Sequence, residues 1–420
     1  MITAAAFVVL LALGMPVAFV LIGATFAFIL STGTYGMLDS LPQVLFSSIE
    51  IFDLLAIPLF VLLGEVMNEG GITRRIINAA RAWLQWVPHS LAYVSLLANL
   101  MLSSIMGSAT AQIAIMSRVI VPAMEKDGYD RSFATALTAA AGLLGPIIPP
   151  SMVFIIYGVV GQVSIGSMFI GGILPGLLLF GLLCGITALG ARRWRTRVSA
   201  SQPVDGLWRA TGEALLTLSI PMAIVGGISF GIVTPTESAA VAIVLAVVIG
   251  GGFYRELRLS HAPAILGRTA RTTATVLLLI AAAKVFGWVL TFNQVPQIAA
   301  EFLQSLTADP TVFLLLVFVF LMLVGMVLDG IAALIILVPI LLPIAQKTYG
   351  IDPVHFGIMT CLTLTLGLLT PPVGAGLYIA SALTNTGIVL LSRRVLPFIA
   401  VTCAAILLIV FFPWLTTALR

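Results

Sequence analysis

The chain has 420 residues, of which 60% are hydrophobic and 9% charged, and its formal net charge is +4. Because a soluble domain carries about 25% charged residues, this composition excludes a soluble globular protein. The three cysteines (Cys184, Cys361, Cys403) show no paired spacing and are interpreted as small core residues, and the three histidines lie too far apart to predict a metal cluster.

Long apolar runs recur from one end of the chain to the other. Each is long enough to cross ~30 Å of hydrocarbon as a helix. The runs are 5–31, 165–190, 212–233, 235–253, 311–328 and 395–417. The first has neither the basic start nor the small-residue cleavage site of a signal peptide, so we expect one long span or two short ones there. The sequence therefore predicts an all-α polytopic membrane protein.

Two stretches of the chain resemble each other. The stretch "VPAMEKDGYDRSFATALTAAAGLLGPIIPPS" (121–151) parallels "LPIAQKTYGIDPVHFGIMTCLTLTLGLLTPPV" (342–373), and further upstream "IMGSATA" (105–111) falls on "VLDGIAA" (327–333). Two structural repeats are the simplest account of this collinear similarity. The predicted divisions are a first repeat at 1–190, a basic linker at 191–210 and a second repeat at 211–420.

The positions of Lys and Arg indicate that the two repeats have inverted topology. Segment 70–84 has three arginines and its counterpart 293–310 has none, whereas 32–49 has none and its counterpart 254–271 has four. Because cytoplasmic loops are enriched in Lys and Arg, the swap indicates that matching loops lie on opposite sides. The segments predicted to be cytoplasmic are 70–84, 118–131, the linker, 254–271 and 393–394.

This topology requires one re-entrant hairpin and one proline-broken helix in each repeat. The predicted elements are a hairpin at 85–124 with a broken helix at 132–160, and a hairpin at 311–346 with a broken helix at 354–388. Proline has no N–H and interrupts a helix, so the pairs Pro149-Pro150 and Pro371-Pro372 leave backbone carbonyls unpaired. Such backbone is tolerated at membrane depth only where it is buried in protein or lines a wet cavity.

The breaks and the hairpin tips together predict a binding site near the middle of the membrane. Free carbonyls are hard oxygen ligands suited to a small cation, and so are the hydroxyls of Ser108, Thr110, Ser151 and Thr370. The half-helix after each break points its N–H groups at the break, where they suit an anion. Inverted repeats with discontinuous helices are typical of secondary transporters. The competing interpretation, that the prolines merely kink packing helices, is disfavoured by the two matched copies.

Three charged residues stand out within the apolar sequence. Asp329, at the predicted second tip, is interpreted as a cation-site residue, with a water-exposed loop end as the alternative. Glu237, in "TPTESAA", caps a predicted helix or takes part in transport. Lys284, inside a span, pairs with a carboxylate or snorkels to the interface.

Several strings in the right order resemble one known family. They are "GSATA", "PAMEKDGYDRSFATALTAAAG", "GPIIPPS", "YGVV", "TPTESAAVA", "FYREL", "LDGIAALIILVPILLPIAQ", "GIDPVHFGI" and "LTPPVG". Together they resemble the large membrane subunit of TRAP transporters (tripartite ATP-independent periplasmic transporters, DctM-like) over nearly the whole chain.

The resemblance implies a sodium-driven importer of organic acids such as C4-dicarboxylates, sialic acid and other sugar acids, with no cofactor beyond Na⁺ as coupling ion. It implies a small four-helix membrane subunit (DctQ-like), expected here as a separate chain, and a periplasmic substrate-binding protein as partners in the bacterial inner membrane. The implied fold is similar to that of divalent-anion/sodium symporters, with a scaffold and an elevator-type transport region.

The resemblance also implies which residues bind the ion and the substrate. The sodium-binding residues it implies are Gly107, Ser108, Thr110, Gly145, Pro149 and Pro150 in the first half, and Asp329, Gly330, Gly367, Thr370, Pro371 and Pro372 in the second. The substrate-binding residues are Ser108, Ser151, Thr370 and Gly374. Met106 departs from the small residues usual at the first tip.

Three other functions are alternatives to this one. A stand-alone sodium/dicarboxylate symporter would share the site but need no binding protein. An intramembrane enzyme is disfavoured because the sequence has no His/Cys/Glu constellation with ligand spacing and no serine with a recognisable base. A channel needs no inverted break sites, and sodium-gradient dependence of uptake separates it from a transporter.

Overall fold

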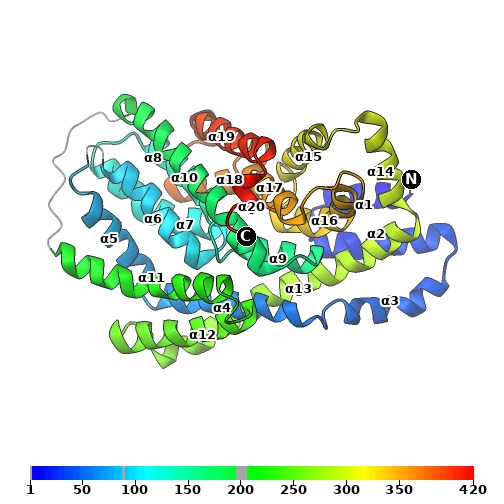
Figure 1. The fold of residues 1–420 in the computed structure, drawn as a ribbon, viewed down its shortest axis with the longest axis horizontal. Coiled ribbons are helices and arrows are strands. Elements are labelled where there is room, and N and C mark those ends of the chain that lie inside the picture. Colours follow the sequence, from blue (N-terminus) through cyan, green and yellow to red (C-terminus); the bar gives the residue numbers. More distant parts are fainter. Residues whose placement is uncertain (1, 88–89, 195–205) are drawn as a thin grey trace.

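The computed structural model describes residues 2–87, 90–194 and 206–420. Residues 195–205, most of the predicted linker, and His89 lie outside this range, so the structure says nothing about them. Every regular element of the described residues is a helix (Figure 1), as the composition predicts. Six of these helices are long and apolar enough to cross a membrane, or up to eight if each of two bent helix pairs counts as one span.

The helices of the first half have the following bounds: α1 (Ile2–Ala12), α2 (Val17–Thr32), α3 (Gly36–Ser47), η1 (Phe52–Leu55), α4 (Ala56–Glu69), α5 (Ile72–Leu84), α6 (Ser90–Met106), α7 (Ala109–Lys126), α8 (Arg131–Ala141), η2 (Gly142–Leu144), α9 (Met152–Gly161) and α10 (Ile165–Trp194). Those of the second half are α11 (Leu207–Ser229), α12 (Pro235–Val247), η3 (Val248–Phe253), η4 (Leu259–His261), α13 (Ala262–Phe292), α14 (Val295–Leu306), α15 (Pro310–Gly325), α16 (Gly330–Lys347), α17 (Pro353–Gly367), α18 (Ala375–Thr384), α19 (Ile388–Phe411) and α20 (Trp414–Thr417).

The apolar run at 5–31 forms two short helices, α1 and α2, and not one long span. Gly14 has a φ of +75°, in the left-handed region that favours glycine. Pro16 follows and cannot donate to the preceding turn. The sequence left open one long span or two short ones, and the structure has two short helices.

Polar side chains cap the N-termini of the second helix in each hairpin and of each broken helix. Ser108 caps α7, and Asp329 caps α16 by accepting from the backbone N–H of Ile331 at 3.1 Å. Asp130 and Asp352 cap α8 and α17 in the same way. These residues accept from N–H groups that have no partner within the helix, which fixes each first turn.

Both proline pairs interrupt the helices where the sequence predicts a break. α8 gives way to one turn of 3₁₀ helix and then irregular backbone up to Ser151, where α9 starts. α17 ends at Gly367, and α18 starts only at Ala375. The peptide bonds Pro149-Pro150 and Pro371-Pro372 are both cis.

Each hairpin packs against the broken helix of its own half and against the broken helix of the other half. α8 lies against α6 and α7, and α17 lies against α15 and α16. In addition, α7 of the first hairpin contacts α18, while α16 of the second hairpin contacts α9. A Cβ added to Gly376 would lie 3.0 Å from Ile113, and one added to Gly161 would lie 2.8 Å from Leu342, so both crossings are close. The division into two inverted repeats stays a prediction. The contacts place the hairpin of each predicted repeat against the half-helix that follows the break in the other repeat.

The long helix α13 connects this central group to the rest of the fold. It packs against α2, α4 and α16. α11 and α12 lie with α4 along the lower edge of the molecule in Figure 1, and α13 runs from there toward α2 and α3. Arg268 fastens α13 to α4, because its guanidinium contacts Glu65 and Glu69 at 2.7 Å each.

The predicted membrane orientation can be tested at two exposed positions. Leu259 is 91% exposed in the segment predicted to be cytoplasmic, and Ser305 is exposed on α14, which is predicted to face outward. In intact cells, a membrane-impermeant maleimide should label Ser305→Cys and leave Leu259→Cys unlabelled until the membrane is opened. The native chain measures background labelling of its own cysteines. The reverse pattern would contradict the inverted arrangement.

Candidate functional site

The two hairpin tips, more than 200 residues apart in the sequence, meet at one small cavity. Its volume is about 60 Å³. It is lined by Gly107, Ser108, Ala109, Thr110, Pro146, Met152, Val153, Asp329, Gly330, Ile331, Leu364, Thr365 and Leu368. We call it the tip cavity.

The tip cavity lies where helix ends of both polarities converge. The first residues of three helices line it: Ala109 of α7, Met152 of α9 and Gly330 of α16. The free N–H groups and the partial positive charge of a helix N-terminus suit an anion. Leu364 and Thr365, near the C-terminal end of α17, line the same cavity, and carbonyls at that end suit a cation. Residues from helix ends of both polarities therefore line the cavity.

The first tip is pressed against the first break. Gly107 has a φ of +56°, and a Cβ added to it would lie 2.9 Å from the amide nitrogen of Met152 and 3.3 Å from the carbonyl oxygen of Pro150. Only glycine allows this approach without displacing backbone. Ser151, fully buried, donates to the carbonyl of Pro146 at 2.5 Å and caps α9.

Behind the first tip lies a buried pair of amides that the sequence reasoning missed. Gln112 donates through Nε2 to the carbonyl oxygen (2.7 Å) and to Oδ1 (2.8 Å) of Asn99, and Asn99 donates through Nδ2 to the carbonyl of Ser95 at 2.7 Å. Because all three partners are acceptors, both amide orientations are fixed. Oε1 of Gln112 therefore faces Gly145, where a Cβ would lie 2.6 Å from it, and it has no hydrogen-bond partner within the described chain. Polar residues in a membrane hairpin are a sequence signal that could have identified this pair.

Replacing Gln112 should lower the stability of the first hairpin. Gln112→Met keeps the length of the side chain but leaves the fully buried Oδ1 of Asn99 without its donor. The loss of a buried partner costs about 1–3 kcal/mol, so the melting temperature in detergent should fall. Gln304→Met, at an exposed position of α14, should leave it unchanged. Equal melting temperatures for both variants would contradict a structural role for the amide pair.

The second tip approaches the second break through glycines. Gly325, at the end of α15, touches Gly367, at the end of α17, where an added Cβ would come within 2.4 Å of backbone. Thr370 is buried and donates to the carbonyl of Leu366 at 2.9 Å. Gly374 has a φ of +43° and precedes α18. Pro372, in contrast with the buried Pro149 and Pro150, is exposed, so the second break is the more accessible of the two.

The structure brings only part of the predicted site to the tip cavity. The predicted residues that line it are Gly107, Ser108, Thr110, Asp329 and Gly330. Those that do not line it are Gly145, Pro149, Pro150, Ser151, Gly367, Thr370, Pro371, Pro372 and Gly374. Asp329 is exposed and caps α16 through one carboxylate oxygen, and its predicted part in cation binding stays a prediction.

The tip cavity is too small for an organic acid. Small-molecule sites usually measure ~300–1,000 Å³, whereas about 60 Å³ accommodates an ion with little water. In this conformation the tips are close together, and the cavity between them has no room for such a molecule.

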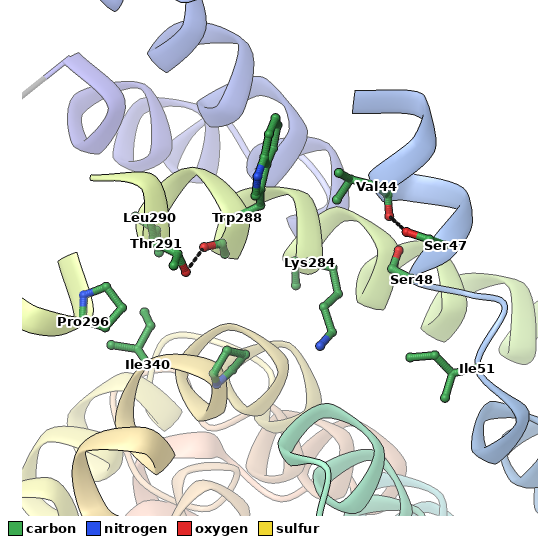
Figure 2. Close-up of a pocket in the computed structure, with 13 residues that line it drawn as sticks. Val44, Ser47, Ser48, Ile51, Lys284, Trp288, Leu290, Thr291, Pro296 and Ile340 are labelled. Atoms are coloured by element: carbon green, nitrogen blue, oxygen red, sulfur yellow. Dashed lines mark hydrogen bonds between the residues drawn. The ribbon is translucent and has the colours of Figure 1, made fainter. Parts of the chain in front are cut away.

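The other two charged residues singled out in the sequence lie away from this cavity. Glu237 completes a capping box at the start of α12, accepting from the backbone N–H of Thr234 at 2.8 Å, so the capping interpretation is confirmed. Lys284 projects from α13 into a separate cavity (Figure 2).

Comparison with known proteins identifies the family to which the chain belongs. Residues 4–415 match the family described as "Tripartite ATP-independent periplasmic transporter, DctM component". The chain is 38% identical over 412 residues to the sialic acid TRAP transporter large permease protein SiaM of Vibrio cholerae, covering 98% of this chain and 96% of that protein.

Two further proteins are similar to this chain. The isethionate TRAP transporter permease protein DctMQ of Oleidesulfovibrio alaskensis is 38% identical over 97% of this chain, and the match spans 64% of that longer protein. The solved structure of the YdaH transporter of Alcanivorax borkumensis has a TM-score of 0.65 over 91% of this chain and 89% of that chain, at 16% identity, which shows likeness of fold. The prediction of a membrane transporter, and not an enzyme, is confirmed: the chain belongs to the DctM component family of the tripartite ATP-independent periplasmic transporters.

Proposed function

We propose that this chain is the large membrane subunit of a sodium-driven importer of organic acids in a bacterial inner membrane. The observation that carries the proposal is the tip cavity, where three helix N-termini, the end of α17 and the carboxylate of Asp329 converge. A sodium ion held there by oxygen atoms would offset the charge of an organic anion held by N–H groups. The family membership and the sialic acid transporter among the relatives support an organic acid as cargo.

The same proposal includes two partners. The family is tripartite, which supports a periplasmic binding protein and a small membrane subunit as the other components. The relative named DctMQ is longer than this chain, which supports a small subunit fused to the large one in that protein.

The mechanism we propose uses the separation of the tips. Since the closed tip cavity has room for an ion only, uptake requires a conformation in which the two hairpin tips move apart. The central group, α6–α9 and α15–α18, is the proposed moving unit, and the peripheral helices α4 and α11–α13 are the proposed scaffold. This assignment gives the elevator movement that the family resemblance implies.

Uptake into vesicles tests the function directly. The chain, reconstituted with its small subunit and binding protein, should accumulate one of N-acetylneuraminate, succinate or gluconate only while a sodium gradient is present. Equal uptake after the gradient is collapsed would contradict sodium coupling and favour a channel. Full uptake without the binding protein would favour the stand-alone symporter.

A further inference from the structure

A larger cavity than the tip cavity lies between α13 and α16. Its volume is about 400 Å³, within the usual ~300–1,000 Å³ of small-molecule sites. The end of α3 and the start of α14 complete its walls (Figure 2), through Ser47, Ser48 and Pro296. We call it the Lys284 cavity. Unlike the tip cavity, it has room for an organic acid in this conformation.

The only charged side chain among the residues that line the Lys284 cavity is Lys284 itself. In Figure 2 its side chain extends from α13 into the open space toward α16. Within the described chain it has neither a hydrogen bond nor a salt bridge, and no acidic residue lines the cavity. An ammonium without a counter-charge inside a membrane span is costly and is by default a functional residue. Because the described chain supplies no counter-charge, the ammonium is open to an anion from outside the protein.

The hydroxyls in the same walls indicate what else the ligand carries. Ser48 donates to the carbonyl of Leu45 at 2.7 Å, and Thr291 donates to the carbonyl of Gly287 at 2.8 Å. With their hydrogens committed to backbone carbonyls, these hydroxyls present lone pairs and act as acceptors. Acceptors complement a ligand with hydroxyl groups of its own. An ammonium next to hydroxyl acceptors thus fits a hydroxylated organic acid.

The Lys284 cavity is aligned with the tip cavity along α9 and α16. Ile331 and Met152 line the tip cavity, whereas one narrow hollow beside Lys284 is lined by Ile335 and Val160 of the same two helices. From Ile331 to Pro339, which lines both this hollow and the Lys284 cavity, α16 rises about 12 Å, at ~1.5 Å per residue. The hollow itself has no room for water, so the two cavities are separate in this conformation.

We propose that the Lys284 cavity is a second anion site, where the carboxylate of a hydroxylated organic acid rests on Lys284 before it reaches the tips. The nature of the cargo rests on the proposed function, but binding at this site needs no sodium because the ammonium of Lys284 supplies the positive charge. The site belongs to α13, on the proposed scaffold, and so it stays in place when the tips separate.

Calorimetry on the purified full chain in sodium-free choline buffer tests the site. Gluconate or N-acetylneuraminate should bind, and Lys284→Gln should weaken that binding at least tenfold. Lys284→Arg, which keeps the charge, should bind more tightly than Lys284→Gln. Lys347→Gln removes the same charge at the exposed end of α16 and should match the native chain. Because this buffer contains no sodium, the result does not depend on sodium coupling, so a failure of the proposed function and a failure of this site are distinguishable.

Three results would overturn the proposal. The first is equal affinity of the native chain and Lys284→Gln, and the second is no binding of either acid without sodium. The third is lysine-dependent binding of phosphatidylglycerol added to the micelles with no binding of either acid, which would assign the cavity to a lipid phosphate.

Discussion

Replacing Asp329 with asparagine is expected to leave the chain folded and to raise the sodium concentration for half-maximal uptake by roughly tenfold or more, because a close opposite charge is lost. Asparagine caps a helix about as well as aspartate, so the hydrogen bond from Ile331 to this side chain can persist and α16 keeps its start. What the variant loses is the carboxylate charge in the tip cavity. The measurement is uptake in reconstituted vesicles over a series of sodium concentrations.

Asp352→Asn is the matched control for this prediction. Asp352 caps α17 through the same kind of bond, accepting from Val354 N–H at 2.9 Å, but it does not line the tip cavity. The control should keep the native sodium dependence. If both variants, or neither, change it, the charge of Asp329 has no specific part in coupling.

Gly107→Ala is expected to reduce uptake by about tenfold or more while the protein still reaches the membrane, an effect of the size that small misplacements of a site produce. The new Cβ would overlap the amide of Met152 at 2.9 Å, so the first tip must move away from the first break. Alanine at a φ of +56° adds conformational strain of ~1–2 kcal/mol. Membrane abundance, melting temperature and uptake are measured together.

Gly350→Ala separates these two effects. Gly350 has a φ of +64°, but nothing lies within 4 Å of the Cβ that alanine would add. This variant carries the strain without the contact, and it should lose some stability while keeping uptake. Loss of uptake by both variants to the same extent would mean that strain, and not the position of the first tip, explains the defect.

The sequence predicted the features of this fold that depend on local chemistry. Paired prolines cannot continue a helix, so both breaks were visible, and a short polar residue before an apolar run marks a helix start, as at Ser108 and Asp329. The "TPTE" string contains its own capping box, which explains why the function of Glu237 as a cap was predictable.

What the sequence did not reveal depends on contacts between distant segments. The meeting of Gly107 with Met152, and of both tips in one cavity, arises from packing that no local pattern encodes. The hydrogen-bonded pair Asn99–Gln112 joins two helices of one hairpin. That this pair lies next to Gly145 is visible only in the folded structure. Lys284 likewise could be noticed in the sequence, but its lack of a counter-charge within the described chain is a property of the folded protein.

A density map of the full chain in lipid nanodiscs, recorded once in sodium and once in choline buffer, tests the central claim most directly. The claim is that the backbone oxygens and side chains at the hairpin tips and the proline breaks hold sodium between the two halves of the chain. We expect ion density in the tip cavity, beside Gly107 and Asp329, in the sodium map alone. Identical maps in the two buffers, with no ion at either tip, would contradict it.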